Sequence, residues 1–146
     1  MSPASANPLQ GVRVLLVEDD EDNRELFALV LRGAGAEVRA AVDAQDAMRT
    51  ILQWPPTVMV SDLTMPAMDG FTLLREIRSV YPKILAIAVT GMSDPKDRDA
   101  ALAAGFQALA TKPVDPEALI AVVVQWAALD GAGTVDASPV RPSPLP

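Results

Sequence analysis

Short apolar runs alternate with longer segments of helical periodicity along the middle of the chain. The runs are rich in Val, Ile and Leu and predict strands at residues 13–17, 37–41, 58–61, 84–89 and 108–110. The first and fourth runs are almost continuously apolar, which is typical of strands covered on both faces. The segments between the runs predict helices at residues 22–33, 44–53, 71–80, 95–104 and 116–129.

Residues that favour helix ends punctuate these segments. Asp43, Asp94 and Asp115 each come directly before a predicted helix, where a carboxylate can accept hydrogen bonds from the first N–H groups. Three glycines fall where helices should stop, namely Gly33, Gly35 and Gly105. Alternating strands and helices indicate repeated βα units with right-handed crossovers. We therefore predict an α/β fold, a doubly wound five-stranded parallel sheet with five helices in a three-layer sandwich.

Small residues and prolines concentrate at both ends of the chain. Residues 1–10 and 131–146 contain little that could build a core, so we expect two disordered tails, the second of them Pro-rich. No internal repeat or linker interrupts the segment between them. Residues 11–130 are therefore expected to form one domain, which is large enough to bury a hydrophobic core.

Charge and composition exclude several kinds of function. The 12 basic and 19 acidic residues leave a net charge of −7, which argues against direct DNA binding. The chain has no Cys and no His, so disulfides, thiol nucleophiles, Cys/His zinc sites and imidazole bases are excluded. Neither a secretory signal nor an apolar run of about 18 residues is present, so we expect a cytoplasmic protein without membrane contact.

Polar side chains follow four of the predicted strands. Five consecutive acids, residues 18–22, follow the first strand, and Asp62, Thr90 and Lys112 follow the third, fourth and fifth. Because parallel strands end at one edge of a sheet, these groups are expected to meet there. Acids before a helix can also be simple caps, but five in succession exceed what capping needs. Asp69 and Gly70 are expected to form a turn, with Asp69 capping a helix and Gly70 supplying a permissive backbone.

Carboxylates at close range repel, so either one of them is protonated or a hard cation lies among them. With oxygen ligands alone, the natural ion is Mg²⁺. A bound Mg²⁺ beside the Lys112 ammonium would attract phosphoryl oxygens, and a carboxylate there could act as a nucleophile. A phosphorylated carboxylate would then be contacted by Thr90 and Lys112 together.

As a set, these residues resemble the receiver domain of bacterial two-component response regulators over about residues 11–130. The matching motifs are Val14-Leu-Leu-Val-Glu-Asp-Asp20, Asp62-x-x-Met-Pro-x-Met-Asp-Gly70, Ala88-Val-Thr-Gly91 and Thr111-Lys-Pro113. The resemblance implies a flavodoxin-like, CheY-like sheet with the strand order 2-1-3-4-5. It also implies that Asp62 is phosphorylated by a kinase phosphohistidine, that Thr90 is the switch hydroxyl, and that Lys112 contacts the phosphoryl group before a cis Pro113.

The resemblance also implies the ligands of Mg²⁺. Glu18, Asp19 and Asp62 would supply carboxylates, and Thr64 would supply its backbone carbonyl. The acidic pair is expected to be Glu18 and Asp19, with Asp20 facing outward or capping the helix. A shift of the pair to Asp19 and Asp20 stays open.

Two positions depart from the family pattern. Leu109 stands where an aromatic switch residue is common, so either the coupling to Thr90 differs or Leu109 is simply part of the core. Thr64 and Met92 stand where family members tune hydrolysis, and neither is an acid or amide that could orient an attacking water. We therefore expect a slowly decaying phosphorylated form.

The predicted function is that of a stand-alone receiver in two-component phosphorelay signalling, since the chain ends soon after the last predicted helix. It would receive its phosphoryl group from a cognate histidine kinase and signal to an unidentified protein partner as a monomer or a phosphorylation-dependent dimer. It would not be an enzyme beyond catalysing its own phosphorylation and dephosphorylation. The alternatives are a receiver of or beside a hybrid kinase, acting as a phosphate sink or relay, and a pseudo-receiver that only binds partners.

Overall fold

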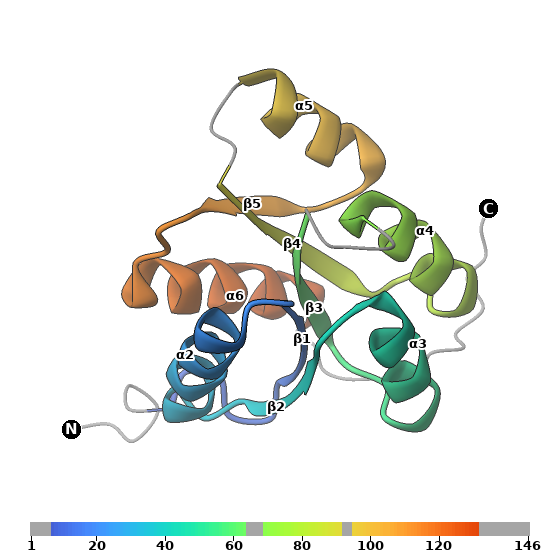
Figure 1. Ribbon diagram of the computed structural model, residues 1–146. Coiled ribbons are helices and arrows are strands. Elements are labelled where there is room, and N and C mark those ends of the chain that lie inside the picture. The colour runs from blue at the N-terminus through green and yellow to red at the C-terminus, as the bar shows by residue number, and fades with distance from the viewer. Residues whose placement is uncertain (1–6, 64–68, 92–94, 132–146) are drawn as a thin grey trace.

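Five parallel strands form a single sheet in the computed structural model, which describes residues 7–63, 69–91 and 95–131 (Figure 1). The strand order is β2-β1-β3-β4-β5. The elements are, in chain order, β1 (Arg13–Val17), α2 (Glu21–Gly33), β2 (Glu37–Ala41), α3 (Ala44–Gln53), β3 (Val58–Asp62), α4 (Gly70–Val80), β4 (Leu85–Thr90), α5 (Pro95–Ala104), β5 (Ala108–Thr111) and α6 (Pro116–Gly131). The predicted doubly wound α/β sandwich is confirmed, and the element bounds agree with the predicted ones to within two residues.

The sheet is covered on both faces, and each face has its own hydrophobic core. Alternate residues of β1 point to opposite sides, as the period of a strand requires: Leu15 belongs to one core and Leu16 to the other. The first core lies under α3 and α4, and the second under α2 and α6 (Figure 1). Burial on both faces explains why β1 and β4 are almost continuously apolar.

Carboxylates cap the helices, as the sequence predicts. Asp43 accepts the N–H of Asp46 at 2.8 Å at the start of α3, and Asp115 accepts the N–H of Ala118 at 3.1 Å in α6. At the other ends, Gly105 follows α5 with φ +113°, a conformation that L side chains rarely adopt. The capping role predicted for Asp94 lies outside the described residues.

Gly70 is required for a different reason from the predicted one. It begins α4 after the N-cap Asp69, whose side chain accepts the N–H of Thr72 at 2.8 Å. Its φ is not positive. An ideal Cβ on Gly70 would instead lie 2.6 Å from the backbone oxygen of Asp62 and 3.0 Å from Cα of Leu63. The expectation of a permissive backbone was therefore wrong, because α4 starts against the end of β3 and leaves no room for a side chain.

The folded part of the chain begins earlier than residue 11. Leu9 is completely buried in the core under α2 and α6, and its N–H donates to the carbonyl of Ala34 at 2.8 Å. The expected tails otherwise fall in residues 1–6 and 132–146, outside the described residues, and stay predictions. Within the described ranges, no helix combines the length and apolarity needed to cross a membrane.

Helix α5 packs loosely, and Arg78, a partly buried arginine of α4, holds the chain that follows α5. Ala101 is the one fully buried residue of α5 among those described. Arg78 donates to the carbonyl of Gly105 at 2.7 Å, to the carbonyl of Ile84 at 2.9 Å and to Oε1 of Gln107 at 3.0 Å. Burial lowers the pKa of the Arg78 guanidinium. The hydrogen bonds to Gly105 and Gln107 span 27 and 29 residues of sequence. Together with the bond to Ile84, they connect α4 to the beginnings of β4 and β5.

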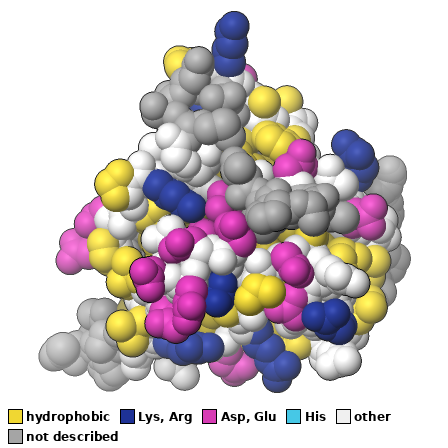
Figure 2. Space-filling model, in the orientation of Figure 1, with side chains coloured by type: hydrophobic (Ala, Val, Ile, Leu, Met, Phe, Trp, Pro, Cys, Tyr) yellow, Lys and Arg dark blue, Asp and Glu magenta, His cyan; other side chains and the backbone are white. Residues whose placement is uncertain are grey.

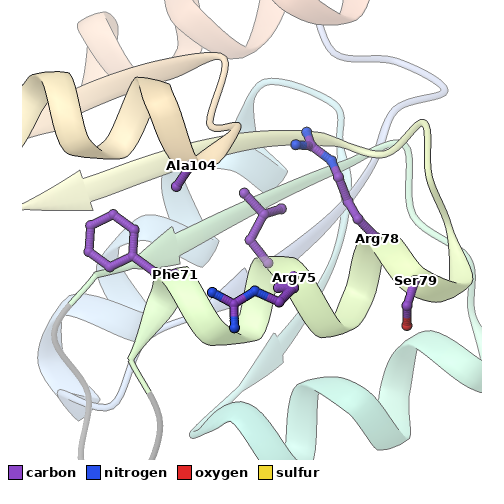
Figure 3. A pocket seen from close by; sticks show the side chains of 6 residues that line it. Phe71, Arg75, Arg78, Ser79 and Ala104 are labelled. Carbon is purple, nitrogen blue, oxygen red and sulfur yellow. The ribbon is translucent and has the colours of Figure 1, made fainter.

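A groove of about 520 Å³ runs beside this arginine between α4 and α5 (Figure 3). Its walls are formed by Phe71, Leu74, Arg75, Arg78, Ser79 and Ala104. The Phe71 ring meets that of Phe106 edge to face, with 6.2 Å between the ring centroids. The groove therefore lies over the hydrophobic core under α3 and α4, to which Phe106 belongs.

Candidate functional site

The carboxyl ends of four strands bring the predicted site residues to one edge of the sheet. Val17 pairs with Ser61, which places Glu18 beside Asp62 at the ends of β1 and β3. Asp62 in turn pairs with Val89, and Thr90 pairs with Thr111. Residues that are far apart in sequence thus become neighbours along the sheet edge. Asp62 and Thr90 are the last residues of their strands, whereas the sequence predicted that each would come directly after its strand.

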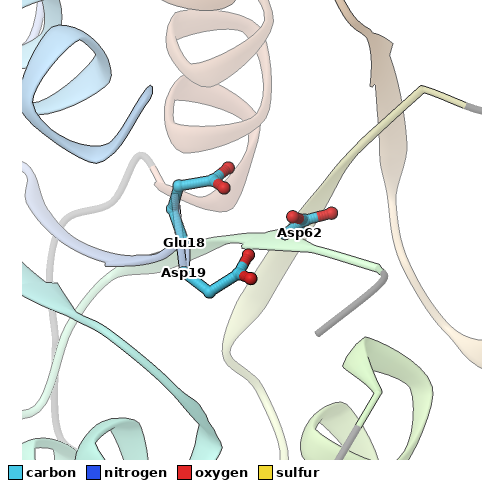
Figure 4. A group of neighbouring side chains, drawn as sticks. All are labelled: Glu18, Asp19 and Asp62. Atoms are coloured by element: carbon cyan, nitrogen blue, oxygen red, sulfur yellow. The ribbon is translucent and has the colours of Figure 1, made fainter. Parts of the chain in front are cut away.

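Three carboxylates gather at this edge (Figure 4). Glu18, Asp19 and Asp62 each offer an oxygen, and these three oxygens lie within 4.8 Å of one another. Glu18 is 1% exposed and Asp62 6% exposed, whereas Asp19 is exposed. Figure 2, in the orientation of Figure 1, shows that acidic side chains are frequent on this face of the molecule. Such a concentration of negative charge requires either a proton or a cation to offset the repulsion.

Asp20 does not belong to this cluster. Its side chain accepts the N–H of Asn23 at 2.9 Å and so caps α2. Its own N–H donates to Oε2 of Glu18 at 3.1 Å. The geometry therefore places Glu18 and Asp19, rather than Asp19 and Asp20, beside Asp62.

Lys112 supplies a positive charge to the cluster. Its Nζ lies 3.3 Å from Oε1 of Glu18 and 3.2 Å from Oδ2 of Asp62. Burial acts to lower the pKa of the Lys112 ammonium, but attraction by Asp62 and Glu18 is stronger, so the pKa is raised. Lys112 is therefore charged at neutral pH. The peptide bond between Lys112 and Pro113 is cis, as predicted.

Glu18 is the most deeply buried acid of the site. Burial raises the pKa of its carboxyl, the N–H of Asp20 opposes the rise, repulsion by Asp62 adds to it, and Lys112 opposes it. Its Oε1 atom is fully buried and accepts no hydrogen bond from the described residues, although the Lys112 ammonium is near. A buried carboxylate oxygen with unused acceptor capacity suits a cation ligand.

The donor set fits Mg²⁺. Glu18, Asp19 and Asp62 offer only oxygens, and Mg²⁺ is bound in proteins through a few carboxylates with water completing its shell. Thr64, the fourth predicted ligand, lies outside the described residues, as does Met92. The carboxylates alone therefore support the predicted metal centre.

The two predicted switch positions lie on adjacent strands. Thr90 is 1% exposed at the end of β4. Leu109 on β5 is partly buried and packs against the core under α3 and α4 without belonging to its fully buried part. It pairs with Ala88, two residues before Thr90.

Sequence reasoning did not single out Arg24. Its Nη1 donates to the carbonyl oxygens of Glu18 and Asp19 at 3.0 and 3.2 Å. The signal in the sequence is a lone arginine among six acids between residues 18 and 25. The helix dipole disfavours a cation at the start of a helix, so an arginine at this position is expected to make a specific stabilising contact.

Residues 14–124 match the response regulator receiver domain family, and the chain belongs to this family. An uncharacterised 14.6 kDa protein from the sodA1 3′ region of Leptolyngbya boryana is 42% identical over 116 residues, which cover 77% of this chain and 88% of that protein. The transcriptional regulatory protein PrrA of Mycobacterium tuberculosis is 33% identical over 111 residues, 76% of this chain. The chain spans only 48% of PrrA.

Solved structures agree with this assignment. The chemotaxis response regulator CheY4 of Vibrio cholerae superposes with a TM-score of 0.73 and 29% identity, covering 80% of this chain and 98% of CheY4. The BeF3-activated receiver domain of DrrB gives a TM-score of 0.73 and 25% identity, covering 79% of this chain and 96% of that domain. The chain is therefore a CheY-like receiver domain, and its role lies in two-component signalling.

Proposed function

We propose that Asp62 is the phosphoacceptor of this receiver domain and takes its phosphoryl group from the phosphohistidine of a cognate histidine kinase in a Mg²⁺-dependent reaction. The observation that carries this proposal is the position of Asp62. It lies almost buried at the end of β3, with the Lys112 ammonium at 3.2 Å and two further carboxylates around it.

In the transfer step, a carboxylate oxygen of Asp62 attacks phosphorus. The new O–P bond forms as the P–N bond of the phosphohistidine breaks, and the electron pair of that bond stays on the imidazole, which takes up a proton. Lys112 holds Oδ2 of Asp62 and attracts the phosphoryl oxygens as they arrive. Glu18, Asp19 and Asp62, with the carbonyl of Thr64, would hold Mg²⁺, which supplies charge neutralisation on the phosphoryl oxygens.

The chain itself cannot be the donor. These 146 residues contain no His, so the phosphohistidine must lie outside them. Once Asp62 carries the phosphoryl group, the Thr90 hydroxyl can donate to a phosphoryl oxygen beside Lys112. Phosphorylation would thus shift the balance between two conformations of the same fold. Leu109 packs against the core and has no aromatic ring, so the shift would be transmitted by repacking around Thr90 and not by a rotating ring.

The phosphorylated domain would signal through protein contacts, as a monomer or a phosphorylation-dependent dimer, and not by binding DNA itself. The net charge of −7 favours a protein partner over a nucleic acid. It would catalyse only its own phosphorylation and dephosphorylation. A receiver acting beside a hybrid kinase as a phosphate sink or relay would use the same chemistry at Asp62.

The test is to incubate the chain with Mg²⁺ and a small phosphodonor such as acetyl phosphate, and to measure its intact mass. The wild type should gain one phosphoryl group, and Asp62→Asn should gain none. Asp99→Asn, at an exposed position of α5, is the matched control and should be modified like the wild type. A gain of mass in Asp62→Asn would refute the assignment. No gain in the wild type, together with no spectral change on adding Mg²⁺ and beryllium fluoride, would favour a pseudo-receiver.

A further inference from the structure

Arg24 makes an unexpected set of contacts beside the acidic cluster. It lies in α2, four residues after the N-cap Asp20, and its own N–H donates to the carbonyl of Asp20 at 2.9 Å. Its Nη1 reaches back over this first turn to the carbonyl oxygens of Glu18 and Asp19, at 3.0 and 3.2 Å. One guanidinium nitrogen thus connects two successive peptide groups.

These two peptide groups determine where the acidic side chains lie. β1 ends at Val17, and the last sheet-like contact of this strand is the N–H of Glu18 to the carbonyl of Ala41, at 3.1 Å. The chain then leaves the sheet and turns into α2. The orientation of Asp19, which is exposed, depends on the turn itself, because no packed core surrounds its side chain.

Arg24 acts through the backbone and not through charge pairing. Among the described residues, which include every acid from 18 to 25, no carboxylate lies within ion-pair distance of its guanidinium. An arginine that served only to neutralise these acids would pair with one of them. Its two hydrogen bonds instead end on carbonyl oxygens, which attract a charged donor more strongly than a neutral one.

We propose that Arg24 is a positioning residue for Mg²⁺ binding: it fixes the two peptide groups that carry Glu18 and Asp19, and so pre-organises the carboxylates. This inference rests on the proposed function of the site. The direction in which Mg²⁺ affinity changes when Arg24 is replaced distinguishes this positioning role from a purely electrostatic effect of its charge. Removing a positive charge near a cation site should tighten Mg²⁺ binding if charge alone mattered. Loss of pre-organisation should weaken it, as loss of an outer hydrogen bond does at other metal sites.

The experiment is a calorimetric titration of the purified chain with Mg²⁺, comparing the wild type with Arg24→Met and Arg24→Lys. Arg24→Met should raise the Kd by about 10-fold. Arg24→Lys keeps the charge but replaces the rigid guanidinium by an ammonium on a flexible stem, and should fall between the other two. Arg32→Met is the matched control, because Arg32 lies in the same helix and donates to the carbonyl of Val38 at 2.9 Å, away from the acids. Its Kd should equal that of the wild type.

A second measurement does not depend on the metal. The N–H of Asp20 donates to Oε2 of Glu18, so its exchange with solvent reports on the order of the turn. In metal-free protein, Arg24→Met should speed the exchange of this amide without lowering the thermal midpoint of the whole domain by more than Arg32→Met does. A Kd that is unchanged or lower in Arg24→Met, or an unchanged Asp20 exchange rate, would overturn the positioning role. If the wild type binds no Mg²⁺, the metal part of the proposed function fails, and the exchange rate alone decides whether Arg24 orders the turn.

Discussion

Gly70 links the stability of the fold to the geometry of the phosphoacceptor, and Gly70→Ala should damage both. The new Cβ would lie 2.6 Å from the backbone oxygen of Asp62, closer than the 3.0 Å below which Cβ contacts essentially never occur. To reach an ordinary contact of 3.4 Å with the oxygen of Asp62, the end of β3 and the start of α4 must separate by about 0.8 Å. Neither side can yield cheaply, because both contacts are with the backbone of Asp62 and Leu63.

The expected cost follows from these distances. Forcing an extra carbon into a packed site costs about 1–3 kcal/mol. Alanine is the better helix former by about 1 kcal/mol, and the first position of α4 captures only part of that gain. Gly70→Ala should therefore lower the free energy of unfolding by about 1–2 kcal/mol. Because Asp62 moves with its carbonyl, phosphorylation by a small phosphodonor should slow as well.

The assay is urea unfolding followed by tryptophan fluorescence, with Gly33→Ala as the matched control. Gly33 lies at the end of α2, has no positive φ, and a Cβ there would meet nothing within 4 Å. Its substitution should leave stability unchanged or raise it by up to about 1 kcal/mol. The reasoning is refuted if Gly70→Ala is as stable as Gly33→Ala and is phosphorylated at the wild-type rate.

Three further outcomes follow from the site and its surroundings. Burial raises the pKa of the Glu18 carboxyl above its ordinary 4.5, so the folded state holds this proton more tightly than the unfolded chain does. Protonated Glu18 therefore adds to the free energy of unfolding at low pH, and this stabilisation is lost as the pH rises through the raised pKa. In EDTA, the stability of Glu18→Gln relative to the wild type should therefore increase from pH 4.5 upward, and parallel urea midpoints across that range would contradict this. Arg78→Met removes three hydrogen bonds from partly buried acceptors and should cost about 2 kcal/mol in unfolding experiments, whereas an unchanged midpoint would mean that water replaces the guanidinium. Because neither Thr64 nor Met92 is an acid or amide that could orient a water, the phosphorylated form should persist for minutes or longer with Mg²⁺ present. Loss of the added mass within seconds would show that hydrolysis is assisted by another group.

Most elements of the fold could be predicted because their signals are local. A strand between two layers of helices must be apolar along its whole length, and a carboxylate at an N-cap satisfies N–H groups only two or three residues away. The same locality explains why Asp62 and Lys112 could be assigned to one site. Each follows a recognisable strand, and the ends of parallel strands meet at one edge.

The rest depended on distances between residues that are remote in sequence. Whether Asp19 pairs with Glu18 or Asp20 was open until the turn showed Asp20 capping α2. The burial of Leu9 depends on its contact with Ala34, and the need for Gly70 depends on the carbonyl of Asp62. A periodic pattern states which face of a segment is apolar but not how closely two segments approach. The sequence by itself determined the elements and the chemistry they carry, whereas only the tertiary structure decided which backbone groups leave room for a side chain and which carbonyls Arg24 and Arg78 can reach.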